Sequence, residues 1–498
     1  MSIAQSTESV ASWRGTTWPM AVAVLGAGLA VLGLAFSTEV AAAVDIWDRS
    51  TAYNHCWLVL PLALWLAWAR RHRLAVLRPE PTLLAAVPAL GAGLAWLAAE
   101  RLGIMEGRQL AALSLTICFI LAVVGWRVGR AMAAPLLYLF FLVPFGAFLT
   151  PVLQKVTAWF IVAGLQLLQI PHYADDLIIE IPAGTFLVAE ACAGLRFIIA
   201  ALAFGALYGF VMFRSLSRRL AVMLLAIVVP VVANGLRALG IVLLGHHLGS
   251  AQAAAADHLV YGWIFFSIVI LLLVAAGLPF REDGRPADVA PADAAVVRRL
   301  PAVRGAALVT AALICGLVAL AGPSLAMALN RASVTAEARP APLFAPADCQ
   351  AVGAGTLRCG DGTLQVNISA FSPRSTWSQV ASARYELAGD DDEALLLTVK
   401  NSDALWQLRQ DRDAARIVAS AAWLNGEPVG DGLRSRLAQG WNSLRGDNGR
   451  PVLVTLLWRP DSARDGTGAV RDRNWLRKVL EEKSMDLGQQ AAELSRPG

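Results

Sequence analysis

The chain has 498 residues, of which 57% are hydrophobic and only 16% are charged. Soluble domains carry about 25% charged residues, so this composition excludes an ordinary soluble protein and indicates a polytopic membrane protein. The net charge of +5 does not indicate nucleic-acid binding, because the lysines and arginines cluster in short loops between apolar segments. The six cysteines form no Cys-x-x-Cys pair and no Cys/His cluster with zinc spacing, so we expect no metal and no other cofactor.

Nine apolar segments are predicted to be membrane spans. They are residues 17–36, 55–69, 82–99, 109–126, 131–150, 190–213, 219–244, 259–280 and 303–326. The basic loops between them fall on one side if the spans alternate, and the positive-inside rule makes that side cytoplasmic. The N-terminus is then predicted to lie inside, and the chain after Met327 outside.

One further apolar stretch, residues 151–170, does not fit this count. If it crossed the membrane, Cys192 would move to the cytoplasmic end and the basic loop 214–219 would move outside, against the charge rule. We therefore expect the stretch to be interfacial or re-entrant. Residues 172–185 then alternate and turn like a short extended excursion over the outer face, and they lead into the sequence around Cys192.

Changes in composition divide the chain into five parts. These are a cytoplasmic N-terminal segment (1–16), the main transmembrane domain (17–280), a cytoplasmic linker rich in Pro, Ala, Asp and Arg (281–302), a last transmembrane helix (303–326) and an outer α+β domain (327–498).

Short alternating runs in the last part, at 363–368, 394–399 and 452–458, predict strands, and 403–424 is interpreted as helical. Cys349 and Cys359 would lie in an oxidising compartment, so we expect a disulfide between them.

Three polar features lie at the outer ends of consecutive predicted spans. Cys192 belongs to the run Glu190–Arg196, which opens the span 190–213. Asn234-Gly235-Leu236-Arg237 interrupts the next span, and His258 opens the one after that. Because these three spans alternate in direction, the predicted topology brings all three features to the same membrane face.

Such a trio suits nucleophilic acyl transfer, in which a thiolate attacks a carbonyl and forms a thioester. A nearby guanidinium or imidazolium favours the thiolate. Histidine also protonates a leaving amine, whereas arginine stays charged, so His258 suits the acid and Arg237 suits the stabiliser of a developing oxyanion.

Each of these residues also has a purely structural interpretation. Cys192 alone is typical of a small packing residue in a membrane helix. Arg237 costs about 2.5 to 3.5 kcal/mol within an apolar span unless it faces a polar cavity, although near the outer end it would snorkel. His258 alone suits an interfacial position, and His246 and His247 compete with it but have no Asp257 beside them.

Taken together, the motifs resemble those of the exosortase and archaeosortase family of membrane-embedded cysteine transpeptidases. The resemblance lies in Ala191-Cys192-Ala193-Gly194-Leu195-Arg196, then Asn234-Gly235-Leu236-Arg237, then His258 followed by Gly262-Trp263 and Phe266. Tyr53-Asn54-His55 is similar to the family's Tyr-x-His-Gly step, with Cys56 in place of the usual glycine. The resemblance covers about residues 45–280.

The resemblance implies that residues 17–280 are the catalytic domain, with Cys192 as the nucleophile and Arg237 and His258 completing the catalytic set. Glu190, Arg196, Asn234 and His55 would support them. The implied substrates are exported proteins with a C-terminal sorting tail of the PEP-CTERM type, made of a short Pro-Glu-Pro motif, a transmembrane helix and a basic cluster.

The resemblance also implies a setting and partners. The protein would lie in a bacterial inner membrane, among lipid, with its site and its C-terminal domain on the periplasmic side. It would pass the cleaved protein to a glycan or amine acceptor, or to water, in connection with surface or exopolysaccharide export. No nucleic-acid partner is expected.

A second hypothesis from a different class is a non-catalytic membrane component of exopolysaccharide export or polymerisation with a periplasmic module. Arg237 would then contact an anionic lipid-linked sugar, and alkylation of the thiol would be harmless. A transporter fits less well, because the hydropathy shows no inverted repeat and the spans carry no chain of carboxylates.

Overall fold

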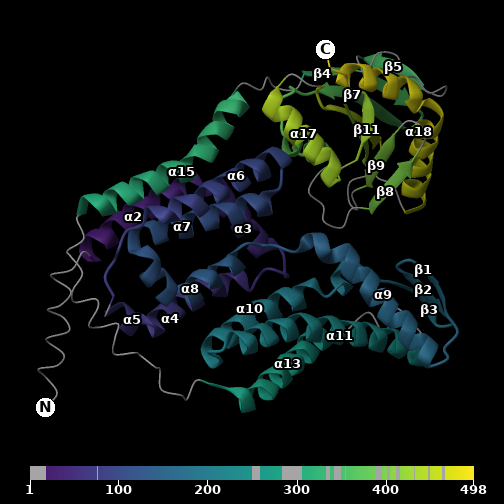
Figure 1. Cartoon of the computed structure of the whole chain (residues 1–498). Helices are drawn as coiled ribbons and strands as arrows, with labels where there is room; N and C mark the ends of the chain where they lie inside the picture. The colour runs from purple at the N-terminus through teal and green to yellow at the C-terminus, as the bar shows by residue number, and fades with distance from the viewer. Residues whose placement is uncertain are drawn as a thin grey trace, which may run out of the picture. The chain divides into compact units, whose positions relative to one another are not determined.

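The computed structural model describes residues 18–75, 77–249, 258–282, 305–331, 337–340, 349–353, 355–388, 395–400, 404–410, 416–430, 432–446, 449–461 and 466–497. The chain divides into two compact units (Figure 1). Unit 1 comprises residues 1–89 and 112–317, and unit 2 comprises residues 90–111 and 318–498. The predicted segment 1–16 and most of the predicted linker 281–302 lie outside the described residues.

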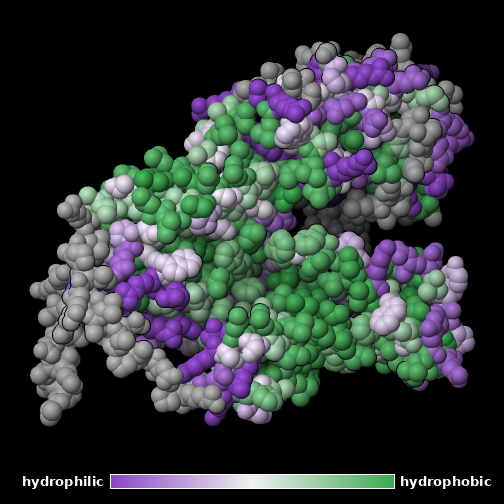
Figure 2. All heavy atoms as spheres, viewed as in Figure 1, coloured by the Kyte–Doolittle hydropathy of each residue, from purple (hydrophilic) through white to green (hydrophobic). Residues whose placement is uncertain are grey.

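The apolar segments form helices because long apolar runs satisfy their backbone polar groups internally. The longer helices are α2 (Trp18–Ala35), α4 (Cys56–Ala69), α6 (Ala86–Leu102), α7 (Met105–Ala131), α9 (Thr150–Leu167), α10 (Leu195–Met212), α11 (Leu216–Leu248), α13 (His258–Gly277) and α15 (Gly305–Arg331). Within the described residues, seven stretches are long and apolar enough to cross a membrane. Figure 2 shows hydrophobic side chains gathered over α10, α11 and α13, as expected of surfaces that face lipid. The chain is a multi-pass membrane protein.

The shorter helical pieces connect these helices. They are α3 (Ser37–Arg49), α5 (Arg71–Ala75), η1 (Leu83–Ala85), α8 (Ala133–Tyr138), η2 (Leu139–Leu142), η3 (Ala147–Leu149), η4 (Glu190–Cys192) and η5 (Leu278–Phe280).

The predicted span 131–150 is not one helix. Its helical part stops at Leu142, and Val143 is extended with ψ 122°. The residue before a proline avoids the helical region, so Pro144 ends the helix, and Gly146 at φ +123° turns the chain before η3. The prediction failed because hydropathy alone does not register these two helix breakers.

The stretch expected to be interfacial forms α9, and Ala147–Leu167 is among the seven stretches long enough to cross. Its packing places it beside the second half of α11. Thr157 lies against Asn234 and Gly164 against Leu239, so the two helices run in the same direction. The interfacial placement of this stretch stays a prediction.

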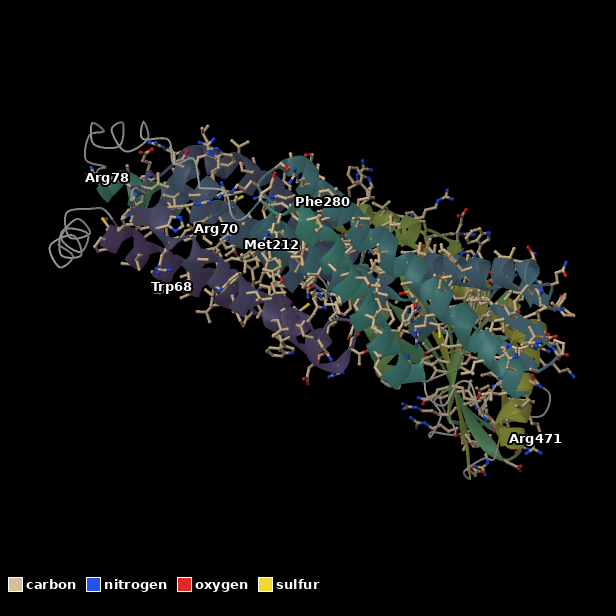
Figure 3. The ribbon with its side chains drawn as sticks, turned by 90° about the horizontal axis from the view of Figure 1, so that it is seen from below. Trp68, Arg70, Arg78, Met212, Phe280 and Arg471 are labelled. Atoms are coloured by element: carbon tan, nitrogen blue, oxygen red, sulfur yellow. A yellow bond between two sulfur atoms is a disulfide. The ribbon has the colours of Figure 1, made fainter. Side chains whose placement is uncertain are left out.

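The basic loops predicted to share one side meet at one end of unit 1, which we call the basic end. There Arg70 at the end of α4 donates to the carbonyl of Phe210 in α10 (2.9 Å), and the amide of Glu282 donates to the carbonyl of Met212 (2.8 Å). Figure 3 shows Arg70, Met212 and Phe280 at these neighbouring helix ends. The opposite end of α4, α10 and α13 holds Cys192, and we call it the cysteine end.

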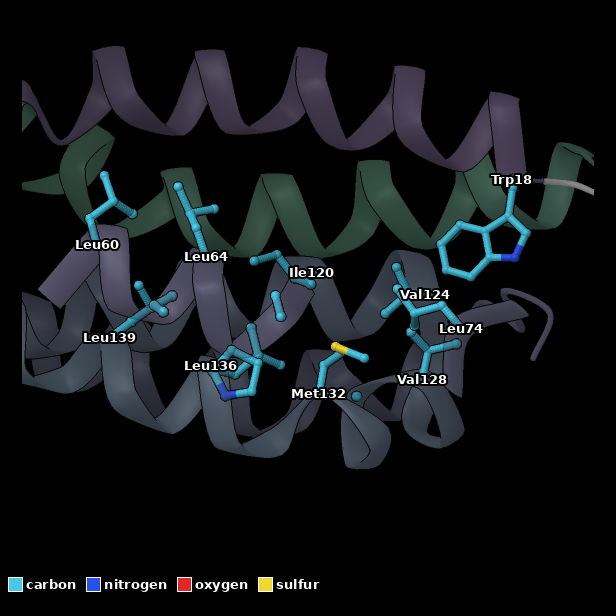
Figure 4. Close-up of a pocket in the computed structure, with 14 residues that line it drawn as sticks. Trp18, Leu60, Leu64, Leu74, Ile120, Val124, Val128, Met132, Leu136 and Leu139 are labelled. Atoms are coloured by element: carbon cyan, nitrogen blue, oxygen red, sulfur yellow. The ribbon is translucent and has the colours of Figure 1, made fainter. Parts of the chain in front are cut away.

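An apolar cavity of about 310 Å³ lies in unit 1 (Figure 4). Residues of α2, α4, α5, α7, α8 and η2 line it, among them Trp18, Leu64, Val128 and Leu136. None of its lining residues comes from the cysteine loop or from α11, so this cavity is separate from the candidate site.

Unit 2 contains an α+β domain built on a nine-stranded sheet. Its strands are β4 (Glu337–Pro340), β5 (Cys349–Gly353), β6 (Thr356–Cys359), β7 (Gly362–Ala370), β8 (Leu395–Lys400), β9 (Leu405–Gln410), β10 (Ile417–Leu424), β11 (Glu427–Val429) and β12 (Val452–Pro460). The main order is β5-β6-β7-β12-β10-β9-β8, and all pairs are antiparallel. Helices α16 (Trp377–Ala388), α17 (Leu433–Arg445) and α18 (Gly466–Ser495) complete the domain.

The interpretation of 403–424 as helical is wrong, because this stretch forms strands β9 and β10. Trp406 and Leu408 on β9 and Trp423 on β10 are buried in the domain core. β10 is buried on both faces of the sheet along most of its length, so its sequence lacks the alternation of a half-exposed strand. The strands predicted at 363–368, 394–399 and 452–458 correspond to β7, β8 and β12.

Cys349 and Cys359 are joined by a disulfide across the β5–β6 hairpin. In the same unit, the turn between α6 and α7 is attached to the domain, because Arg436 of α17 donates to the carbonyl of Gly103 (2.8 Å).

Candidate functional site at the cysteine end

A three-stranded antiparallel sheet leads the chain into Cys192. Its strands are β1 (Tyr173–Asp175), β2 (Ile178–Ile181) and β3 (Gly184–Leu187), which correspond to the predicted extended excursion. Ile179 and Ile181 of β2 pack against Ala238 and Val242 of α11, so the sheet is fixed on that helix. After β3, the single turn η4 carries Cys192, which is partly exposed, and α10 begins at Leu195.

Asn234 of α11 holds the cysteine loop from behind. Its side chain is 3% exposed, and its Nδ2 donates to the carbonyl of Cys192 (2.9 Å) and to Oγ1 of Thr157 (3.1 Å). Gln154 of α9 donates from Nε2 to the carbonyl of Val188 (2.9 Å). Because buried polar groups are costly to leave unpaired, these bonds fix the backbone on both sides of Cys192.

Gly194 allows Asn234 to approach this closely. Its φ of +79° is in the left-handed region, and a Cβ there would lie 2.5 Å from Cγ of Asn234. Any other residue at position 194 would be strained and would also collide with the amide that holds the loop. Gly194 is therefore required for the cysteine loop to pack closely against Asn234.

The register of α10 against α11 brings Arg237 to the level of Cys192. The two helices run antiparallel, with Gly205 against Ala226 and Gly194 against Asn234. Arg237, three residues after Asn234, is 3% exposed, and its guanidinium lies 5.8 Å from the ring centroid of Phe197.

A second guanidinium lies over the same ring, because Arg196 is 4.8 Å from the centroid of Phe197. Two guanidiniums thus lie over one aromatic ring close to the cysteine loop.

Helix α13 runs parallel to α10. The rings of Phe197 and Phe266 are 4.6 Å apart, and Tyr208 donates to the carbonyl of Val274 (3.1 Å). His258 is the first residue of α13 and precedes Phe266, so it lies toward the cysteine end of that helix.

The side chain of His258 and the neighbouring Asp257 lie outside the described residues.

The remaining predicted residues occupy different places. Glu190 is exposed on η4. His55 lies at the cysteine end of α4, where its Nε2 is 3.8 Å from Sγ of Cys56, so its described contact is with that thiol and not with Cys192. His246 and His247 lie in the last turn of α11, more than two turns beyond Arg237.

Sequence reasoning missed Gln154 and Thr157, which bind the cysteine loop from α9. Both are buried, and they lie three residues apart on one face of an apolar helix. That spacing predicts a specific contact for this face of the helix, because polar residues on a buried helical face usually have a partner. In the described part of the chain, no group of three or more His, Cys, Asp or Glu side chains is arranged to hold a metal ion.

Comparison with protein families identifies this region. Residues 47–275 match the family described as "Transmembrane exosortase (Exosortase_EpsH)". This segment belongs to the transmembrane exosortase family. No curated protein and no solved structure matches the chain.

The exosortase segment contains Cys192, Asn234, Arg237 and His258, and it ends before α15 and the C-terminal domain. Exosortases are a family of transmembrane cysteine transpeptidases associated with the processing of sorting signals. The resemblance inferred from the motifs is thus confirmed at the level of the family.

Proposed function

We propose that this protein is a membrane cysteine peptidase or transpeptidase that cleaves the C-terminal sorting signals of exported proteins. The observation that best supports the proposal is the shared level of Cys192 and Arg237 within an exosortase segment, with His258 opening the neighbouring helix α13 at the same end. If Cys192 were only a packing residue, the site would need neither the buried Arg237 near Asn234 nor two guanidiniums over the ring of Phe197.

The proposed reaction begins when the Cys192 thiolate attacks the scissile carbonyl and a C–S bond forms. Arg237 stabilises the oxyanion of the tetrahedral intermediate. The C–N bond then breaks, and His258 gives a proton to the leaving amine. The product is a thioester on Cys192 and a released tail, and an amine or water then attacks the thioester and frees the thiol.

The proposed substrate is an exported protein whose tail is of the PEP-CTERM type, with a short motif, a transmembrane helix and a basic cluster. A helical tail in the same bilayer would present its motif at the membrane surface, which is where the cysteine end would lie. In this proposal the basic end is cytoplasmic and the cysteine end is periplasmic in a bacterial inner membrane, because the arginines of the loops gather at the basic end.

The processed protein would pass to a glycan or amine acceptor, in connection with surface or exopolysaccharide export. The C-terminal α+β domain of unit 2 would then be the periplasmic part of the protein.

The direct test is processing of a reporter that carries such a tail, in cells that express wild type, Cys192→Ala, Arg237→Ala or His258→Ala. The Cys192→Ala variant is expected to lose processing, and the other two are expected to lose it by at least about 100-fold. Cys118→Ala is the matched control, because Cys118 is a buried thiol of α7.

All variants must reach equal levels in the membrane for this comparison. Full processing by Cys192→Ala would contradict the proposal. It would favour the non-catalytic export component, in which the thiol has no chemical role.

A further inference from the structure

Strand β3 is an edge strand that ends five residues before Cys192. The order of the small sheet is β1-β2-β3, so β3 is paired on one side only among the described residues. An edge strand presents unpaired N–H and C=O groups, and natural peptide-binding proteins use such edges to bind an extended peptide as an additional strand.

The hydrogen-bond phase shows which peptide groups face the open edge. The amide of Val188 donates to the carbonyl of Leu177 (2.9 Å), its direct partner across the β2–β3 ladder. Bonded and non-bonded pairs alternate in an antiparallel ladder, so Phe186 and Gly184 bond to β2. The peptide groups of Thr185 and Leu187 therefore point away from the sheet, toward the open edge.

Part of this edge is used locally, because the carbonyl of Leu187 accepts from the amide of Ala189 (2.9 Å). Within the part of the chain that the structure describes, the N–H and C=O of Thr185 and the N–H of Leu187 remain for a partner strand. The side chains of Thr185 and Leu187 are exposed, with Leu187 at 65%. What distinguishes this edge from other strand edges is its position in the chain, directly before the cysteine loop.

The edge is rigidly connected to the thiol. Gln154 holds the carbonyl of Val188, and Asn234 holds the carbonyl of Cys192 (both 2.9 Å). The amide of Cys192 also donates to the carbonyl of Ala189 (2.9 Å). A peptide bound along β3 would consequently have a fixed position relative to Sγ of Cys192.

We propose that the open edge of β3 binds the substrate residues that precede the scissile bond, as a fourth strand of the sheet. This inference rests on the proposed function. A peptide must be extended for its carbonyl to be attacked, and main-chain bonds to Thr185 and Leu187 hold it extended. The substrate runs parallel to β3, because both chains approach Cys192 from the sheet and then enter a helix.

The sheet provides a matched pair of proline variants for the test. Thr185→Pro removes an N–H on the β3 edge, and Ala174→Pro removes one on the opposite edge, because Ala174 lies in a non-bonded pair with Ile179. Proline is tolerated on an edge strand where its N–H faces outward. Thr185→Pro is expected to reduce processing of the tail reporter at least tenfold at unchanged membrane level, whereas Ala174→Pro retains it.

A photo-crosslink gives a second measurement that does not depend on activity. A benzophenone amino acid is placed at Leu187, or at Ala174 as the control, in the full-length chain with Cys192→Ala so that substrate is not consumed. Crosslinking to the tail reporter is expected from position 187 and not from position 174. Equal crosslinking from both positions, or wild-type processing by Thr185→Pro, would overturn the proposal.

These outcomes differ from a failure of the proposed function. If Cys192→Ala without a crosslinker abolishes processing but Thr185→Pro does not reduce it, the edge inference alone fails. If Cys192→Ala still processes the reporter, the proposed function itself fails.

Discussion

Asn234 is the residue through which separate segments of unit 1 meet at the candidate site. One amide nitrogen binds the carbonyl of Cys192 and the hydroxyl of Thr157, and thus connects the cysteine loop, α11 and α9. Arg237 follows on the same helix, so the residue that positions the thiol also determines the depth of the arginine. This coupling explains why Asn and Arg occur together in one motif within an otherwise apolar helix.

Replacing Asn234 by Asp is expected to impair both stability and processing. The carboxylate would face the carbonyl of Cys192 and would donate no hydrogen bond, and losing a buried hydrogen bond costs about 1 to 3 kcal/mol. Thr157→Val is the milder control, because Asn234 keeps its bond to Cys192. We expect at least a tenfold slower processing for Asn234→Asp and at most about threefold for Thr157→Val. Equal rates for the two variants, measured on purified protein in detergent, would show that Asn234 does not hold the loop.

Gly194→Ala tests the close approach between the loop and α11. The substitution is strained at φ +79° and places a Cβ 2.5 Å from Cγ of Asn234, so it is expected to destabilise the protein by at least about 1 to 2 kcal/mol. Gly240→Ala is the matched control, since a Cβ at Gly240 in α11 meets nothing within 4 Å. The unfolding temperature in detergent should fall for Gly194→Ala and stay equal or rise for Gly240→Ala. An unchanged melting temperature for Gly194→Ala would contradict the described geometry.

At the scale of elements, the carboxylate of Glu282 joins two segments at the basic end. Glu282 accepts from the amides of Arg214 (2.8 Å) and Ser215 (3.0 Å) at the start of α11, and it pairs with Arg218 (3.3 Å). These contacts join the chain after α13 to the α10–α11 turn. They thereby hold the end of α13 beside the end of α10.

Glu282→Ala should therefore lower stability by about 1 to 3 kcal/mol, because two backbone amides and Arg218 lose their acceptor. Asp45→Asn, which breaks the exposed Arg49–Asp45 pair (2.9 Å), should change stability by less than about 0.5 kcal/mol. The two are compared by thermal unfolding in the same detergent. If Glu282→Ala behaves like Asp45→Asn, the carboxylate does not stabilise the basic end.

The sequence was sufficient to predict most helices, because long apolar runs leave few alternatives in a membrane. It was insufficient where a tertiary contact decided the outcome. The bonds from Gln154 and Thr157 depend on α9 lying along α11, and hydropathy does not register that arrangement. The error at 403–424 has a similar cause, because a central strand covered on both faces resembles a buried helix in its composition.

For the candidate site, the sequence predicted residues but not the contacts that hold their backbone. The motif order gave Cys192, Arg237 and His258, and the positive-inside rule predicted a common face for them. The role of Gly194 as the point where Asn234 meets the backbone required coordinates. So did the edge position of β3, since strand order in a small sheet does not follow from alternation alone.

At the scale of the whole molecule, the two units are stabilised in different ways. Unit 1 exposes large apolar side chains such as Leu64 (62%) and Leu271 (67%), as expected for helices surrounded by lipid. Unit 2 instead buries Trp406, Trp423 and Trp458 in a sheet core. The family match ends at residue 275, so the α+β domain is an addition to the exosortase segment.

The disulfide between Cys349 and Cys359 should contribute to the stability of the α+β domain. It closes a loop with a sequence separation of 10, which corresponds to about 2 to 3 kcal/mol in the chain-entropy model. We expect a reductant to lower the unfolding temperature of the domain in the full-length protein, followed by tryptophan fluorescence. The double variant Cys349→Ala/Cys359→Ala should unfold at the lower temperature with or without reductant. A reductant effect of the same size in that variant would exclude the disulfide as its cause.

The most direct test of the account is detection of the thioester on Cys192. Purified full-length protein is mixed with a tail-bearing substrate, quenched in acid, and analysed by mass spectrometry of the peptide that contains Cys192. The account predicts an adduct of the substrate residues before the scissile bond, sensitive to hydroxylamine and absent from Cys192→Ala. Cleavage of the tail by wild type with no adduct on Cys192 at any quench time, and equal cleavage by Cys192→Ala, would contradict it.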